Sequence, residues 1–592
     1  MSKELNKRPI EDEASQSTQP ATLKRLKHFS SNQNGTTTES QTEKTHQESP
    51  NDLPVPQSNE NSRKWERFEH NGVMFPENWQ RHNVSITYDG SAVELDEYQE
   101  EIATYWAQGV GTEWHIKSFY RENFQKLFLS SFDPNHPLIV EKKSLHFELF
   151  DFTPIVRQLE SEKTEREALT KDERQQAKEE KEALDQRYKY IIVDGRLEKI
   201  SNFKIEPPTL FKGRGEHPKM GSLKQRIMPE DVELNLSKDA LVPICHLSGR
   251  SWGDISFQND AAWVASYLEP CTGNRKYALL AASSKIKFEN DIKKYERARR
   301  LKNCIETVRA DYRHKMKHGS ARERQMGTAA YFIDFLAIRV GNEKKEDEAD
   351  TVGCCSLRKE HVRLEGDDTI TLDFLGKDSM RYLNTIKVDP IAYQNLEEFL
   401  KGKEETDNIF DLVKTNRLNE YLQTLMEELT AKVFRTYNAS NTLQSELAKS
   451  ANVLAPDDSL EKKLEFYNEA NRQVAILCNH QKGVNKNFEA TLSKHEEKLE
   501  EMRAELQSFG KKGQNTPKAQ KLCSKIEKAE KAIENRQKNK SIALGTSKTN
   551  YNDPRISVAW CKKYEVPIEK IFTSVLLEKF TWAMSCESNW EF

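Results

Sequence analysis

Two hydrophobic heptad seams between residues 488 and 540 constrain the fold of this chain more than any other feature. The first comprises Phe488, Leu492, Leu499, Met502, Leu506 and Phe509, and the second Leu522, Ile526, Ala529 and Ile533. Apolar residues spaced by three, four or seven positions are typical of coiled-coil helices. Because a glycine- and proline-containing loop (510–517, GKKGQNTP) separates the seams, they predict an antiparallel helical hairpin. Each arm is about 30 Å long at 1.5 Å per residue, and the hairpin should protrude, since its other faces carry Lys and Glu.

The composition limits the class of protein. At roughly 150 residues per domain, 592 residues predict about four structural units. No apolar run approaches the roughly 18 residues that span a bilayer, so an integral membrane protein is excluded, and no apolar segment follows the start to indicate a secretory signal. The nine cysteines are scattered and form no CxxC motif. This spacing predicts reduced thiols rather than disulfides or a zinc site.

The first 62 residues are rich in Ser, Thr, Gln and Asn and almost free of aromatic residues. Such a segment buries too little apolar surface to fold, so it is predicted to be disordered. Two basic clusters, Lys7-Arg8 and residues 24–27 (KRLK), resemble a bipartite nuclear import signal. The alternative is that they are ordinary basic clusters of a polar tail.

The middle of the chain predicts alternating hairpins and helices. Residues 85–94 should form two strands around an Asp-Gly turn, and residues 190–193 and 199–203 a second hairpin. A single charged helix is expected over 164–188, and a loop over 207–221. Residues 285–477 should be mainly helical, with a hairpin near 361–384.

Charge is unevenly distributed along the helical region. Between Lys285 and Arg324, 14 Lys or Arg face 6 Asp or Glu, whereas the whole chain carries a net charge of −3. A local basic surface indicates a polyanionic partner. A solvated helix face explains the same count, and charge alone favours that simpler explanation.

Five short segments combine cations with hydrogen-bonding residues, and each has a structural explanation when taken singly. Arg339 would often be an ion-paired helix residue, Lys377 part of a turn, and Arg435 a helix cap. His480 would often be a core or helix-terminal histidine, and Tyr551 a ring stacked in a loop.

The same five residues could act together if the fold brings them to one site. Two arginines can bind the oxygens of a phosphodiester bidentately, and a histidine can donate a further hydrogen bond. A lysine can protonate the leaving alkoxide, and a tyrosine can act as the nucleophile. Together they would form a metal-free phosphoryl-transfer site.

Six motifs then resemble those of the eukaryotic DNA topoisomerase I family, of type IB. They are residues 204–221 (KIEPPTLFKGRGEHPKMG), 339–358 (RVGNEKKEDEADTVGCCSLR), 374–382 (FLGKDSMRY), 429–440 (LTAKVFRTYNAS), 471–481 (NRQVAILCNHQ) and 547–555 (SKTNYNDPR), the last followed by 558–572. They occur in the family's order, and the resemblance extends from about Trp65 to Phe592.

The resemblance implies a role for each of the five residues. Tyr551 would join covalently to the 3′ phosphate of a nicked strand, and Arg339, Arg435 and His480 would bind the scissile phosphate. Lys377 would be the general acid for the 5′-hydroxyl. The free strand would then rotate and be religated, which relaxes positive and negative supercoils and relieves torsional stress in transcription and replication. No ATP, metal or other cofactor is implied, in agreement with the absence of a GxxxxGK[ST] motif.

Further residues match DNA-contacting positions of the family, mostly toward the phosphate backbone. The expected contacts are Arg214, Lys276, Tyr277, Asn342, Lys344, Thr351, Lys432, Asp378, Thr546 and Asn550, with Arg166, Trp263, Lys294 and Asn419 in more divergent surroundings. Asp378, Thr546 and Asn550 also match the surroundings in which camptothecin-type poisons stack.

The implied fold is α+β and multidomain, a bilobed clamp around duplex DNA. After the tail (1–62), residues 63–284 would form a mixed cap lobe and 285–487 a mainly helical catalytic lobe of tyrosine-recombinase-like type. Residues 488–541 would be the coiled-coil linker and 542–592 a small helical C-terminal domain bearing Tyr551. The resemblance further implies a nuclear monomer without membrane contact, whose tail binds transcription and chromatin proteins.

Two departures and two competing functions accompany the resemblance. Asn552 stands where the family usually has a bulky aliphatic residue, and Val340 replaces an alanine. A tyrosine recombinase would use a related residue set, but it lacks the motif at 204–221 and the hairpin between histidine and tyrosine. A non-catalytic DNA clamp is the third hypothesis.

Overall fold

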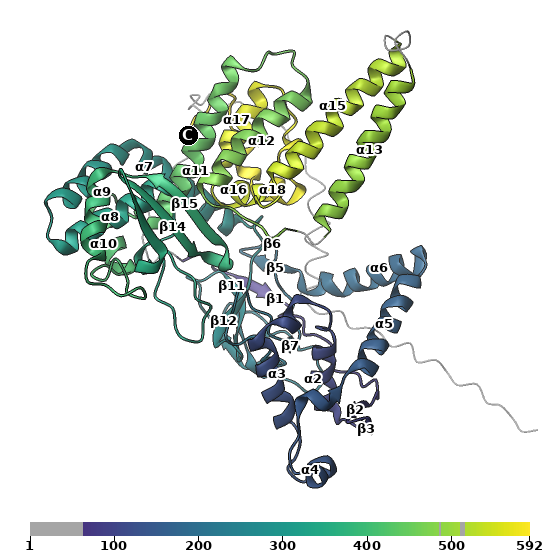
Figure 1. Cartoon of the computed structure of the whole chain (residues 1–592). Coiled ribbons are helices and arrows are strands. Elements are labelled where there is room, and N and C mark those ends of the chain that lie inside the picture. The colour runs from purple at the N-terminus through teal and green to yellow at the C-terminus, as the bar shows by residue number, and fades with distance from the viewer. Residues whose placement is uncertain (1–62, 485–486, 510–515) are drawn as a thin grey trace, which may run out of the picture. The chain divides into compact units, whose positions relative to one another are not determined.

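The computed structural model describes residues 63–484, 487–509 and 516–592 (Figure 1), so the predictions for the tail and for most of the loop at 510–517 lie outside the described residues. The chain is a mixed α+β, multidomain protein, as predicted. It divides into two compact units, described separately below. The first contains residues 63–115, 124–211 and 222–286, and the second 116–123, 212–221 and 287–592. The predicted boundaries of the five segments stay predictions.

Two expectations from composition can be compared with the structure. All nine cysteines are free in the structure, four of them buried. Among the described helices, none combines the length and the hydrophobicity that a membrane span requires.

Short sheets dominate the first unit, and most of their strand pairs are antiparallel. Its strands are β1 (Phe68–His70), β2 (Ile86–Tyr88), β3 (Ser91–Val93), β4 (Phe150–Asp151), β5 (Tyr190–Val193), β6 (Arg196–Lys199), β7 (Thr209–Leu210), β8 (Leu223–Lys224), β9 (Val232–Asn235), β10 (Asp254–Ser256), β11 (Trp263–Glu269) and β12 (Asn274–Leu279). The largest sheet has the order β10-β9-β11-β12, and its β9 and β11 contribute Leu234 and Val264 to the core. The predicted hairpin at 85–94 is confirmed as β2 and β3, whereas 207–221, expected to be a loop, contributes β7.

The second predicted hairpin is present, but its second strand begins earlier than expected. Asp194 and Gly195 both have positive φ, 48° and 77°. A two-residue turn of this kind brings the next residue directly into register. Arg196 therefore pairs with Val193, and β6 occupies 196–199 rather than 199–203.

The single helix expected over 164–188 is wrong, because the chain breaks into two helices. The helices up to residue 188 are α2 (Glu97–Ala107), α3 (Ser118–Ser130), α4 (Pro137–Lys142), α5 (Thr153–Ala168) and α6 (Lys171–Tyr188). Thr170 interrupts the helix. Its side chain accepts from the Glu173 N–H, and the Glu173 carboxylate accepts from the Thr170 N–H at 2.8 Å. This capping box starts a new helix at residue 171.

The second unit is mainly helical, which confirms the expectation for residues 285–477. Its helices before the hairpin are α7 (Lys285–His318), α8 (Ala321–Phe335), α9 (Pro390–Leu400), α10 (Thr415–Leu425), α11 (Ala431–Ala448) and α12 (Leu460–Leu477). The hairpin expected near 361–384 is a three-stranded antiparallel sheet of β13 (Val362–Gly366), β14 (Thr369–Leu375) and β15 (Arg381–Lys387). The loop between β14 and β15 closes with a bond from the Gly376 N–H to the Met380 carbonyl, 2.9 Å.

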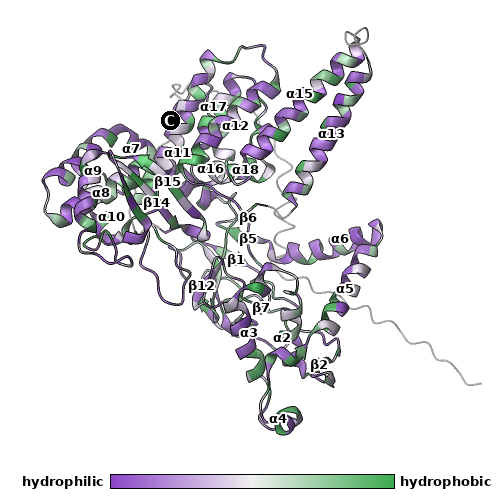
Figure 2. Ribbon diagram, in the orientation of Figure 1, coloured by the Kyte–Doolittle hydropathy of each residue, from purple (hydrophilic) through white to green (hydrophobic). Residues whose placement is uncertain are grey.

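Two long helices follow the heptad seams, α13 (Phe488–Ser508) and α15 (Pro517–Lys538). Leu499, Leu522 and Ile526 are buried between them. The ion pairs Arg503–Glu530 (2.7 Å) and Lys540–Glu489 (2.6 Å) join residues whose order runs in opposite directions, so the helices are antiparallel. Figure 2 shows that many residues along both helices are hydrophilic.

Three short helices close the chain, α16 (Leu544–Asn550), α17 (Pro554–Lys563) and α18 (Ser574–Lys579). Trp560 and Phe580 belong to the same hydrophobic core as α8 and α11. The segment that carries Tyr551 therefore packs as part of the second unit.

Candidate active site

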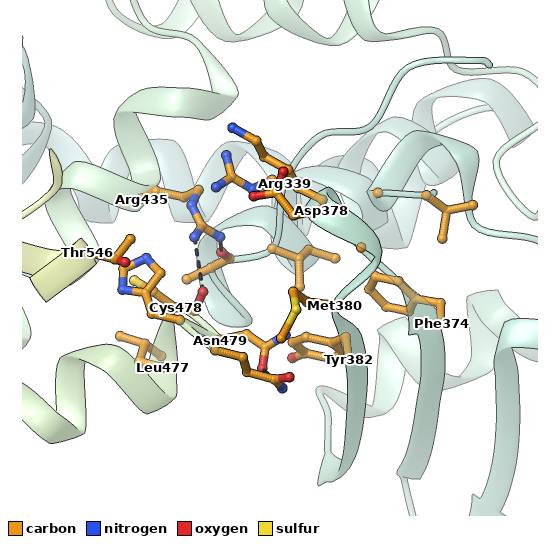
Figure 3. Close-up of a pocket in the computed structure, with 18 residues that line it drawn as sticks. Arg339, Phe374, Asp378, Met380, Tyr382, Arg435, Leu477, Cys478, Asn479 and Thr546 are labelled. Atoms are coloured by element: carbon orange, nitrogen blue, oxygen red, sulfur yellow. Dashed lines mark hydrogen bonds between the residues drawn. The ribbon is translucent and has the colours of Figure 1, made fainter. Parts of the chain in front are cut away.

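One pocket of the second unit, about 140 Å³ in volume, collects four of the five predicted catalytic residues. Arg339, Lys377, Arg435 and His480 all line it, together with the predicted DNA contacts Asp378 and Thr546. Figure 3 shows Arg339, Arg435 and Asp378 on neighbouring elements around this space. Arg339 and His480, which are 141 positions apart along the chain, are thus brought together.

Three of these four residues follow or connect regular elements, and the fourth lies near the start of a helix. Arg339 follows α8, Lys377 lies in the loop between β14 and β15, Arg435 lies in the second turn of α11, and His480 follows α12. The main chain at Arg339 is fixed, because its carbonyl accepts from the Cys354 N–H at 2.8 Å.

Glycine is required beside this arginine. A Cβ on Gly353 would lie 2.5 Å from the Gly341 nitrogen and 2.7 Å from the Arg339 carbonyl oxygen. These distances are shorter than real side chains allow, so the two chain segments approach closely only because both positions lack a side chain.

Arg435 is buried, with 5% of its surface exposed. Its guanidinium donates to the Cys478 carbonyl at 3.0 Å and to the Ala337 carbonyl, bonds drawn as dashed lines in Figure 3. Its Nε has no partner within the described residues. Main-chain carbonyls fix the guanidinium in place, and part of its donor capacity remains for a ligand.

His480 is also buried, and its two ring nitrogens differ in surroundings. Nδ1 lies 2.8 Å from the Ser547 hydroxyl, whereas Nε2 has no partner in the described part of the chain. Burial and then the charges of Arg435 and Arg339 lower the pKa of His480 to about 3. The imidazole is therefore neutral at physiological pH.

Tyr551 ends α16 and lies against the same residues. Its ring stacks on His480, with centroids 5.1 Å apart and planes inclined by 24°, and the Arg435 guanidinium carbon lies 5.0 Å from the ring centroid. Burial alone would raise the pKa of Tyr551, but the charges of Arg435 and Arg339 and hydrogen bonding to them outweigh burial and lower it. A phenol with a lowered pKa beside two arginines is suited to nucleophilic attack on an anion.

Three residues that hold this site together were not predicted from the sequence. Ser547 bonds to His480 as described above, and the Ser440 hydroxyl donates to the Tyr551 carbonyl at 3.1 Å. Arg555 forms a 2.7 Å ion pair with Asp553, just after the tyrosine. Ser547 and Arg555 lie within the motif at 547–555, but nothing in the sequence indicates which partners they meet.

Of the predicted DNA contacts in the second unit, several lie in loops or on exposed helix faces. Arg214 is exposed and forms an ion pair with Asp378. Lys344 and Lys432 are exposed too, and Lys344 forms an ion pair with Glu348 at 3.8 Å. Thr351 is half-buried and lies in the second half of the motif at 339–358. Asn342 and Asn419 line a second pocket, about 410 Å³ in volume, that contains none of the five predicted catalytic residues.

Two predicted contacts are engaged in structural bonds. Asn419 accepts from the Ala431 N–H at 3.0 Å, which caps the start of α11. Lys294 forms an ion pair with Asp291 at 3.1 Å and donates to the Asn550 carbonyl at 3.3 Å. Both residues therefore hold segments that carry predicted catalytic residues, Arg435 on α11 and Tyr551 after Asn550.

The remaining predicted contacts belong to the first unit. Lys276 and Tyr277 lie on β12, and the Tyr277 ring lies 6.1 Å from that of Trp263 on β11. Trp263 is buried and presents little surface to a ligand. Arg166 is exposed on α5, where its Nε donates to the Glu162 carbonyl. Arg166 therefore lies on a different element from the predicted contacts on β11 and β12.

Among the residues that the structure describes, no group of three or more His, Cys, Asp and Glu side chains is placed to hold a metal ion.

Comparison with known proteins decides the family. Three family models match the chain in succession: the DNA-binding fragment of eukaryotic DNA topoisomerase I over residues 63–280, its catalytic core over 283–513, and a C-terminal topoisomerase domain over 523–592. This chain belongs to the eukaryotic DNA topoisomerase I family.

Individual relatives agree with this assignment. The chain is 43% identical over 561 residues to DNA topoisomerase 1 of Homo sapiens, covering 89% of this chain and 72% of that protein. It is 42% identical over 560 residues to DNA topoisomerase 1 beta of Arabidopsis thaliana and 44% identical over 542 residues to DNA topoisomerase 1 of Drosophila melanogaster. The chain spans 60% and 55% of the length of these two relatives.

Proposed function

We propose that this protein is a type IB DNA topoisomerase, which relaxes supercoiled DNA by cutting one strand, letting it rotate and rejoining it. The observation that carries the proposal is the convergence at one pocket of two arginines, a lysine and a neutral histidine, with the Tyr551 ring stacked on that histidine. Family membership supports the same reaction.

In the first step the Tyr551 oxygen attacks the scissile phosphorus, and the bond from phosphorus to the 5′ oxygen breaks. The phenol gives up its proton to solvent water readily, because the charges of Arg435 and Arg339 stabilise the phenolate and so lower the pKa of Tyr551. Negative charge grows on the non-bridging oxygens, where Arg339, Arg435 and the free Nε2 of His480 donate.

Lys377 donates a proton to the departing 5′ oxygen, so the leaving group is a neutral hydroxyl. Lys377 lies in the exposed loop between β14 and β15 and lines the same pocket as Arg339 and Arg435, so its side chain can reach the departing oxygen. The 3′-phosphotyrosyl ester retains the energy of the broken bond, and the reverse reaction religates the strand. No ATP is required for either step.

The proposal extends to the whole assembly. Duplex DNA is the substrate, held by a bilobed clamp in which residues 63–284 form the cap and the hairpin of α13 and α15 links the catalytic lobe to the C-terminal domain. The backbone contacts proposed above, from Arg214 to Asn550, give affinity with little base reading. The protein acts in the nucleus as a monomer, and its tail binds transcription and chromatin proteins.

Relaxation of supercoiled plasmid in EDTA, without ATP, tests this function. The native protein and Tyr564→Phe should relax the plasmid, because the Tyr564 hydroxyl bonds to Ser450, 2.8 Å away and outside the pocket. Tyr551→Phe should bind DNA but leave it supercoiled. Relaxation by Tyr551→Phe, or none by the native protein, would refute the proposal, and cleavage confined to one fixed sequence would indicate a recombinase.

A further inference from the structure

Ser547 joins the two residues that matter most for the proposed chemistry. It lies on α16, is fully buried, and its hydroxyl is 2.8 Å from Nδ1 of His480. Its carbonyl accepts from the N–H groups of both Tyr551 and Asn552, each at 2.9 Å. One residue thus contacts the histidine through its side chain and the tyrosine through its main chain.

The direction of the bond between Ser547 and His480 determines what the histidine can do. A neutral imidazole carries one proton, so one ring nitrogen donates while the other accepts. If the serine hydroxyl donates to Nδ1, the proton of the ring is on Nε2, which can then donate to a phosphate oxygen. If the hydroxyl instead accepts from Nδ1–H, Nε2 has a lone pair that repels the same oxygen.

Hydrogen-bond satisfaction favours the first arrangement. A hydroxyl that accepts from Nδ1–H must find another acceptor for its own proton, and within the described residues His480 is the partner found for this buried side chain. An unused buried donor is costly. When the hydroxyl donates, both groups are satisfied, and the one proton left over is that of Nε2, a buried atom without a partner among the described residues.

We propose that Ser547 is a positioning residue that fixes the tautomer of His480, so that Nε2–H faces the scissile phosphate. This inference rests on the proposed transesterification. Ser547 touches neither the substrate nor the reacting atoms; it acts through the imidazole, in the way that a second partner orients a ligating or catalytic histidine elsewhere.

The test compares Ser547→Ala with a matched control. Ser557→Ala also removes a buried hydroxyl from the C-terminal segment, but the Ser557 hydroxyl bonds to the Tyr467 hydroxyl, 2.6 Å away. Single-turnover cleavage of an oligonucleotide duplex, in which the protein nicks one strand, measures the rate of the covalent step. Loss of one donor to a developing charge slows such a step by about 10²- to 10³-fold.

Ser547→Ala frees the tautomer without deleting the imidazole, so we expect roughly tenfold slower cleavage, a fraction of the loss for a whole donor. Ser557→Ala should cleave like the native protein. DNA affinity, measured in the Tyr551→Phe background, should be unchanged by either substitution. Ser547→Thr, which retains a hydroxyl, should recover most of the rate.

Two further readouts separate tautomer control from simple packing. In the His480→Gln background, Ser547→Ala should slow cleavage no further, because its effect passes through the histidine. Nitrogen NMR of the histidine-labelled protein, with His480 assigned by difference from His480→Gln, should show the proton on Nε2 in the native protein and a mixture in Ser547→Ala.

A native protein that carries the proton on Nδ1 would overturn the inference. So would equal cleavage rates for Ser547→Ala and Ser557→Ala while the native protein forms the covalent complex normally. If the native protein forms no covalent complex, the proposed function itself fails, and the inference fails with it.

Discussion

Burial of a neutral histidine makes the stability of the second unit depend on pH in a way that can be calculated. His480 has a pKa of about 3 in the folded chain, below its ordinary value of 6.5, because it is buried beside Arg435 and Arg339. The unfolded chain therefore takes up a proton that the folded chain refuses as the pH falls below 6.5. The stability associated with His480 is complete above that value and is lost progressively toward pH 3.

The two pKa values give the magnitude. Through this single group, the free energy of unfolding is roughly 2 kcal/mol lower at about pH 5 than at about pH 8. His480→Gln has no group to titrate, so it should lose roughly 2 kcal/mol less free energy of unfolding between these pH values. Urea unfolding at both pH values, with the slope compared as well as the midpoint, measures the difference.

His70 in the first unit provides the matched control. It is buried too, and burial lowers its pKa to about 4. His70→Gln should reduce the acid loss of stability by a similar amount, yet only His480→Gln should slow cleavage. If the native protein and His480→Gln lose equal stability between about pH 8 and about pH 5, the reasoning from burial is refuted.

Three further substitutions test other contacts. Arg555→Ala should destabilise the C-terminal segment by about 3–5 kcal/mol, because it leaves the buried Asp553 carboxylate unpaired, and limited proteolysis after Tyr551 should reveal it. Leu499→Ala should cost about 2–3 kcal/mol within the hairpin, seen as faster hydrogen exchange in α13 and α15. Lys528→Ala breaks an exposed ion pair with α12 and should change thermal stability by less than about 1 kcal/mol; a larger shift would contradict the surface assignment.

Local patterns predicted those elements whose stability is local. The heptad seams identified α13 and α15 because most seam residues pack against one another across a two-helix interface. The same reasoning failed at 164–188, where composition favoured one helix. A readable signal was missed there: Thr170 and Glu173 have the spacing of a capping box, which marks the start of a helix inside a run of good helix formers.

The candidate site was predicted through family motifs, and its geometry could not have come from spacing. Arg435 and Lys377 are unremarkable in their own helix and turn, and only the folded chain brings them to one pocket. The role of Ser547 is still less visible, since its partner His480 lies 67 positions earlier. Long-range partners of small polar side chains are determined by packing, which leaves no periodic trace in the sequence.

The way Arg435 is held has a thermodynamic consequence. The two hydrogen bonds that fix its buried guanidinium go to main-chain carbonyl oxygens, which orient the group but carry no net charge to cancel its own. Folding therefore retains an electrostatic cost that an anion can relieve, and whatever anion relieves it must in turn stabilise the fold. Sulfate or phosphate should accordingly raise the melting temperature of the native protein more than that of Arg435→Gln, so the affinity of the pocket for a phosphate can be measured without any DNA.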